Sequence, residues 1–192
     1  MHERFALLRI TGELKPWPRS RRRRPPRRRA TISLMSLGVA ALGAAGVLQP
    51  TPRLIWNASA SAPLGIYWVT RDETISRGDL VLAELPDAAR HLAAERGYLP
   101  SGVPIVKHVA AISDDFVCAN SGIVVINNRV AADTLLIDRQ GRPLPAWTAC
   151  RMLTQGEVFL LNEGVRASFD GRYFGPVNSS AIIGSLVPLW IW

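Results

Sequence analysis

Residues 104–112 form an apolar run, Pro-Ile-Val-Lys-His-Val-Ala-Ala-Ile, that contains one lysine and one histidine. Its β-branched residues and short length, with a proline in front, predict a buried β-strand. Five more short apolar runs between turn residues are also predicted to be strands: 66–69, 79–83, 116–118, 123–126 and 157–161. A chain of 192 residues allows one domain with a real core and little more, so we expect a single mainly β domain.

Two shorter patterns complete this expectation. Residues 87–96, which end before Gly97, have the composition of one short surface helix. Residues 126–130 predict a hairpin, because the asparagine pair in the middle tolerates positive φ angles. The glycine and prolines of residues 139–145 predict a loop.

Positive charge is concentrated near the N-terminus. The formal net charge is +8, and eight arginines lie within residues 19–29. Residues 31–48 follow and carry no charge. About 18 such residues at ~1.5 Å each just reach across a hydrocarbon core of ~30 Å, and arginine in front keeps the N-terminus in the cytoplasm. We therefore expect a cytoplasmic tail (1–30), a single-pass signal anchor in the inner membrane (31–49) and a periplasmic domain (50–192).

Other interpretations of this N-terminal pattern remain open. The arginine run could bind nucleic acid, although the apolar segment directly after it favours a membrane and predicts no nucleic-acid partner. Arg28-Arg29 fits a twin-arginine export signal only loosely. The apolar run does not end in a clear Ala-x-Ala cleavage site, which favours a retained anchor over a removed signal peptide.

Cys118 and Cys150 both fall in the part expected to be exported. In an oxidising compartment such a pair predicts one disulfide, worth about 3–4 kcal/mol for a loop of roughly thirty residues, and two buried free thiols are the alternative. The three histidines are scattered, and neither Cys-x-x-Cys nor His-x-x-x-His occurs. We therefore expect no metal and no cofactor.

Lysine usage gives the first chemical indication. The chain has 23 basic residues, and Lys15 and Lys107 are the only lysines among them. An arginine cannot give up its proton in a protein, whereas a lysine on an apolar strand has a lowered pKa and can act as a general base. Lys107 is therefore a candidate base, and a lysine on an edge strand that reaches out to water is the alternative.

The candidate nucleophile lies just after the apolar segment. Ser61 stands two residues before Pro63, on a segment of small residues, and Ser59 would lie on the same face two residues away. A serine- and alanine-rich linker is the alternative. His108 suggests a rival Ser-His-Asp mechanism, but neighbouring side chains on a strand point to opposite faces, and His91 falls on the predicted surface helix.

Together these motifs resemble the bacterial type I signal peptidases, and among them the TraF-type peptidases of conjugative transfer, over roughly residues 50–190. Four segments carry the resemblance: Asn57-Ala-Ser-Ala-Ser-Ala-Pro-Leu-Gly-Ile-Tyr67, Arg77-Gly-Asp-Leu-Val-Leu82, residues 104–112, and Ser168-Phe-Asp-Gly-Arg-Tyr-Phe-Gly-Pro-Val177 followed by Ile183-Gly184. The two-residue step from serine to proline matches the TraF-type enzymes, since the general enzymes have three. Gly171 stands where the family commonly has serine, and Ser113-Asp114 replaces the glycine usual after the lysine strand.

The resemblance implies a role for each matching residue. Ser61 would be the nucleophile and Lys107 its general base. The Ser59 hydroxyl and the Ser61 backbone N–H would hold the oxyanion. Ser168 would orient the lysine amine, with Asp170 and Arg172 as a supporting ion pair. The fold implied is the mainly β fold of a signal peptidase, with shallow pockets for small substrate side chains.

The expected function is that of a serine endopeptidase with a Ser/Lys dyad. Its substrate would be an exported precursor, most simply a conjugative pilin precursor, which it would mature beside a conjugation apparatus. The product would be cyclic where an amine rather than water resolves the acyl-enzyme. Three alternatives stay open: a general signal peptidase, a non-catalytic periplasmic component of a secretion apparatus, and a nucleic-acid tether. Trp56, Trp190, Ile191 and Trp192 would suit an edge that contacts the membrane, or ordinary packing.

Overall fold

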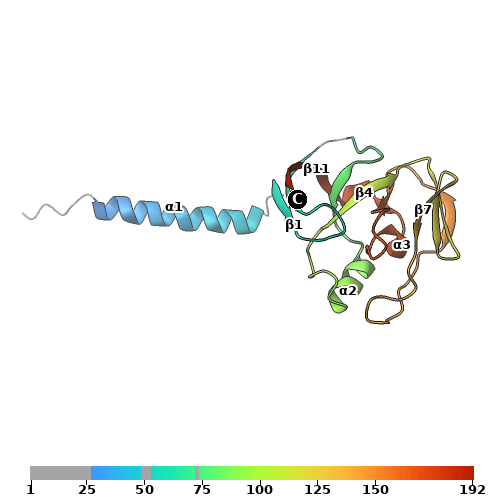
Figure 1. Cartoon of the computed structure of the whole chain (residues 1–192). Helices are drawn as coiled ribbons and strands as arrows, with labels where there is room; N and C mark the ends of the chain where they lie inside the picture. The colour runs from blue at the N-terminus through green and yellow to red at the C-terminus, as the bar shows by residue number, and fades with distance from the viewer. Residues whose placement is uncertain (1–26, 49–52, 72–73) are drawn as a thin grey trace, which may run out of the picture. The chain divides into compact units, whose positions relative to one another are not determined.

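The computed structural model describes residues 27–48, 53–71 and 74–192 (Figure 1). The chain forms two units, residues 1–50 and 51–192, and each is described by itself. In the first unit, helix α1 spans Arg27–Leu48. The helix that the sequence predicted is therefore present, but no helix within the described ranges is both long and apolar enough to cross a membrane. Residues 1–26 of the predicted tail and residue 49 of the predicted anchor lie outside the described ranges.

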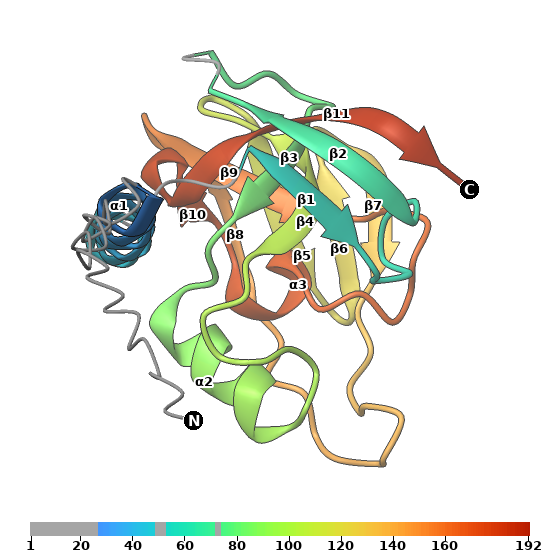
Figure 2. The same ribbon diagram turned by 90° about the vertical axis from the view of Figure 1, so that its left-hand side faces the viewer.

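The second unit is built on two antiparallel sheets (Figure 2). The larger sheet has the strand order β1-β2-β11-β3-β4-β9-β10, and the smaller has the order β7-β6-β5-β8. The strands of the larger sheet are β1 (Leu54–Asn57), β2 (Gly65–Thr70), β3 (Leu80–Ala83), β4 (Ile105–Ala111), β9 (Glu157–Leu161), β10 (Val177–Asn178) and β11 (Ile182–Ile191). Those of the smaller sheet are β5 (Phe116–Asn120), β6 (Ile123–Ile126), β7 (Arg129–Asp133) and β8 (Ala149–Met152).

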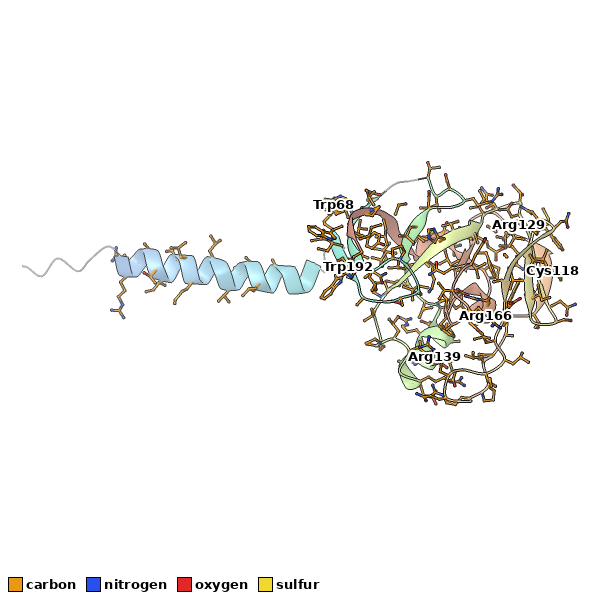
Figure 3. The ribbon with its side chains drawn as sticks, viewed as in Figure 1. Trp68, Cys118, Arg129, Arg139, Arg166 and Trp192 are labelled. Atoms are coloured by element: carbon orange, nitrogen blue, oxygen red, sulfur yellow. A yellow bond between two sulfur atoms is a disulfide. The ribbon has the colours of Figure 1, made fainter. Side chains whose placement is uncertain are left out.

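Two helices and one 3₁₀ turn complete the unit: α2 (Asp87–Glu95), α3 (Gly171–Phe174) and η1 (Ser179–Ala181). The predicted disulfide is present. Cys118 and Cys150 face each other across β5 and β8 and are bonded. Figure 3 shows Cys118 at the end of this unit opposite to the end that carries Trp68 and Trp192.

Strand β9 divides the core between the two sheets. Val158 and Leu160 belong to a buried cluster that includes Ala89 and Ala93 of α2. Phe159 and Leu161 pack instead into a second cluster, with residues of β5 and β6. Successive side chains on a strand point to opposite faces, so one short strand with four apolar residues in a row serves two cores. This explains why residues 157–161 show no alternation of polar and apolar residues.

All six predicted strands and the surface helix are confirmed, with boundaries within three residues. The hairpin is confirmed too, with φ of 48° at Asn127 and 67° at Asn128. The sequence analysis missed β1, β8, β10 and β11, and it included β7 only as the second arm of the predicted hairpin. The longest of them, β11, contains Gly184 and Pro188, which argue against a strand; its pairing with β2 shifts register after Pro188.

Gly171 has no room for a side chain. A Cβ there would lie 2.8 Å from the Leu160 carbonyl oxygen and 2.9 Å from the Phe159 ring. Overpacking of this kind costs about 1–3 kcal/mol. We expect Gly171→Ala to lower the free energy of unfolding by that amount in urea denaturation. Gly164→Ala, where no atom lies within 4 Å, is the control and should change it by less than about 0.5 kcal/mol. Equal stability of the two variants would contradict this account.

Candidate active site

The segment with the predicted nucleophile is a tight loop between β1 and β2. Asn57, the last residue of β1, is buried and donates from Nδ2 to the carbonyls of Ser59, Ala62 and Pro63 at 2.9–3.2 Å. Its Oδ1 accepts from the Ser59 N–H at 3.0 Å. The Tyr67 hydroxyl donates to the Pro63 carbonyl at 2.7 Å. The loop therefore has a fixed shape, and Ser61 stands at its turn.

Lys107 enters the site from β4. Its side chain is only 3% exposed, and its Nζ lies 3.2 Å from Ser61 Oγ and 2.8 Å from Ser168 Oγ. On β4 the neighbouring side chain of His108 is exposed and points to the other face, as period-two alternation requires. The three residues come from separate parts of the chain, and only the fold brings them together.

Burial changes the acidity of this amine. Desolvation lowers the pKa of Lys107 from 10.5 to about 8, since the ammonium form loses its hydration. Two nearby charges act on it with opposite signs: Asp170 raises its pKa and Arg172 lowers it. A substantial fraction of Lys107 is therefore neutral slightly above neutral pH, as a general base must be.

Asp170 and Arg172 form an ion pair that is completely buried. Arg172 donates from Nε to Asp170 Oδ1 at 2.8 Å and from Nη2 to Oδ2 at 2.7 Å. It also donates to the carbonyls of Asp133 and Val165 at 3.1 Å and 2.8 Å. The Asp170 side chain caps α3 by accepting from the Arg172 N–H. Such bidentate pairing keeps both charges in place and fixes the segment that carries Ser168.

Ser59 lies beside Ser61 in this loop. Its Oγ is 2.9 Å from Ser61 Oγ, and the Ser61 N–H donates to it at 3.4 Å. The hydroxyl and the N–H thus lie on one side of the nucleophile, and this arrangement can serve an oxyanion.

One residue that the sequence analysis did not single out joins the site. Asn162, which follows β9, is 3% exposed and donates from Nδ2 to the Ser61 carbonyl at 2.5 Å and to the Val106 carbonyl at 3.3 Å. Its Oδ1 accepts from the His108 N–H at 3.1 Å. In the sequence, the only sign of this residue is an amide directly after the apolar run of the predicted strand 157–161.

Within the described residues, neither histidine side chain is hydrogen-bonded to Ser61, Lys107 or Ser168. His108 Nδ1 is 3.1 Å from the Gly78 carbonyl, and His91 is exposed on α2. Among the described residues, no three His, Cys, Asp or Glu side chains gather in a way that could hold a metal ion.

Two hollows meet at Ser61. The larger, of about 830 Å³, is lined by Lys107, Ser168 and apolar residues such as Leu82, Leu85 and Val103. The smaller, of about 450 Å³, lies beside Pro63, His108 and Asn162. An extended chain that occupies both would place one of its peptide bonds at the serine.

Residues 27–191 match the family described as signal peptidase, peptidase S26. The plasmid transfer protein TraF of Escherichia coli is 34% identical over 176 residues, which cover 86% of this chain and 97% of that protein. The conjugal transfer protein TraF of Agrobacterium fabrum is 30% identical over 172 residues, covering 85% and 97%. Among solved structures, a signal peptidase I from Enterococcus faecalis matches with a TM-score of 0.36 and 15% identity, covering 60% of this chain and 98% of that one.

The family match spans nearly all of the described chain, and relatives at 30% identity or more align along almost their whole length. The chain belongs to the signal peptidase family, peptidase S26.

Proposed function

We propose that the chain is a serine endopeptidase in which Ser61 is the nucleophile and Lys107 the general base. The observation that carries this proposal is the 3.2 Å approach of a desolvated amine to a serine hydroxyl. Neutral Lys107 accepts the Ser61 proton while Oγ attacks the scissile carbonyl. The oxyanion is stabilised by the Ser61 N–H and the Ser59 hydroxyl, and one such donor is typically worth about 10²–10³ in rate.

The intermediate then divides the reaction in two. Protonated Lys107 gives its proton to the leaving nitrogen, the C–N bond breaks, and an ester of Ser61 remains. The restored neutral amine next activates a water molecule, which releases the acid and regenerates the serine. Ser168, 2.8 Å from Nζ, keeps the amine directed at the reaction through both steps.

The substrate is proposed to bind as an extended strand. Among the residues that the structure describes, strand β1 pairs only with β2, so its other edge has no partner strand there. Residues Ile105–Lys107 pair with β3 on one side, whereas β9 pairs with β4 only from His108 onward. A peptide laid between these two edges would find main-chain partners on both sides, as in recognition by strand addition. The larger hollow would then hold the acyl part of the substrate.

Both relatives described above are plasmid or conjugal transfer proteins, which supports a role in conjugation. With that role, the substrate that we propose is a pilin precursor. If an amine of the substrate replaces water in the second step, the product is a ring. A general signal peptidase would instead release signal peptides from unrelated precursors.

We also propose that the domain works outside the cytoplasm, attached to the inner membrane. The disulfide supports an oxidising compartment. Exposed apolar side chains of β1, β2 and β11 support membrane contact, among them Trp56 (72% exposed), Trp190 (69%) and Trp192 (65%). Figure 3 shows Trp68 and Trp192 together at one end of the domain. Indole rings favour the interface between water and lipid.

The proposed activity predicts a specific pattern of products. Wild-type chain incubated with candidate pilin precursors should give one of two results in mass spectrometry. Hydrolysis gives two linear fragments, whereas cyclisation gives a ring that is lighter by one water than the matching linear fragment. Lys107→Arg retains charge but cannot accept a proton, and should lower kcat by about 10²–10⁴-fold. Lys107→Met serves as a second variant without charge, Ser61→Ala should be inactive, and His91→Ala is the control. Activity that survives in Ser61→Ala would rule out the proposal.

The lowered pKa of Lys107 predicts the pH profile. The active form is the neutral amine, so log kcat/KM should rise by about one per pH unit up to a midpoint of about 8 and then level off. At pH 7 about a tenth of the maximal rate is expected. His108→Ala should keep this midpoint. A midpoint near 6.5, the usual value of histidine, that disappears in His108→Ala would point to a histidine mechanism instead.

The membrane contact predicts that lipid quenches tryptophan fluorescence. Full-length chain in vesicles with brominated acyl chains should show quenching, which the double change Trp190→Phe, Trp192→Phe should reduce, with the remainder coming from Trp56 and Trp68. Trp147→Phe is the control, because Trp147 packs against Phe159 in the core. Quenching that stays the same in the double variant would refute contact through β11.

A further inference from the structure

Asn162 connects three parts of the site through one side chain. Nδ2 donates to the carbonyl of Ser61, in the nucleophile loop, and to that of Val106, next to Lys107 on β4. Oδ1 accepts from the backbone N–H of His108, on the other side of Lys107. The lysine thus lies on the strand between two residues whose main chain is bonded to Asn162.

The main chain of Asn162 extends this connection to the ion pair. Its N–H donates to Asp170 Oδ2 at 3.2 Å, and its carbonyl accepts from Arg172 Nη2 at 3.5 Å. The ion pair in turn fixes the segment that carries Ser168. The segments that carry the nucleophile, the base and the orienting hydroxyl are therefore all connected through Asn162.

Only a carboxamide satisfies these contacts. Both N–H bonds of Nδ2 point to carbonyl oxygens, and Oδ1 meets an N–H donor. An aspartate at this position would direct an oxygen at two other oxygens. An aliphatic side chain would leave the Val106 carbonyl, which is part of a buried residue, without this donor.

We propose that Asn162 is a positioning residue, which holds the Ser61 main chain at the distance from β4 at which Lys107 can take the hydroxyl proton. This inference rests on the Ser/Lys mechanism proposed above. Asn57 shapes the nucleophile loop internally, but its side-chain bonds all go to residues of that loop. Asn162 supplies a direct link from the loop to the strand of the base.

The position of the nucleophile loop also governs how dry the amine is. Ser61 is partly exposed and lines both hollows, and its hydroxyl contacts the Lys107 amine. If the loop moves away, water reaches Nζ and hydrates the ammonium form. The charged groups that act on Lys107 from other elements, Asp170 and Arg172, would stay in place because they are bonded to each other.

The test compares the full-length variants Asn162→Ala and Asn162→Ser with Asn178→Ala. Asn178 is the control because it loses a side-chain hydrogen bond at β10, the edge of the sheet opposite to β1. A misplacement of about 1 Å can cost about 10²-fold in rate. Both Asn162 variants should therefore lower kcat about 10–100-fold with KM changed less than threefold. The midpoint of the pH profile should move upward, toward the ordinary pKa of lysine.

Thermal unfolding of each variant separates positioning from stability. The proposal is overturned if a folded variant keeps kcat within threefold of the wild type, or loses kcat with an unmoved pH midpoint. It is also overturned if neither variant folds, because Asn162 would then be a stability residue. Failure of the Ser/Lys mechanism would look different: the wild type itself would be inactive, or Ser61→Ala would remain active.

Discussion

The site depends on one amine that is kept out of water. Lys107 is almost completely buried, and its contacts are two serine hydroxyls and the field of an ion pair. Burial lowers the pKa because it removes the hydration that stabilises an ammonium group. The same burial requires the surrounding segments to be exact in their placement, since a hydroxyl that moves away lets water in. Geometry and proton affinity are therefore set by one structural condition.

This placement of Lys107 is produced by three neighbouring antiparallel strands, β3, β4 and β9, together with the loop that carries Ser61 and the segment that begins at Asn162. β4 pairs with β3 along Ile105–His108 and with β9 from His108 onward. Lys107 therefore lies where one edge of β4 has no partner strand among the described residues. The nucleophile loop and Asn162 lie at this free edge. The opening that a substrate strand needs and the packing that the amine needs thus occur at the same position of the sheet.

The sequence predicted the local elements better than their assembly. Residues 104–112 and 157–161 carry enough β-branched and apolar side chains to identify β4 and β9, and the asparagine pair identifies a hairpin. β11 was missed because Gly184 and Pro188 oppose a strand locally, whereas pairing with β2 and β3 overrides them. Asn162 was missed for a related reason. Its importance comes from contacts with Ser61 and Val106, 101 and 56 residues away, and no local pattern records them.

Two basic side chains are buried in the part of the chain that the structure describes, and their surroundings have opposite effects on their charge. Arg172 is fully buried but has a bidentate carboxylate and several carbonyl acceptors, so it stays charged, and removal of Asp170 would leave an unpaired charge that costs about 3–5 kcal/mol. Lys107 is hydrogen-bonded to two serine hydroxyls and not to a carboxylate. Its burial is therefore not offset by a direct ion pair, and its pKa is lowered to about 8. A guanidinium suits the first position because it never loses its proton, and an amine suits the second because it can. In this chain, where arginine supplies nearly all of the positive charge, a lysine on β4 fits the proton transfer that we propose for Lys107.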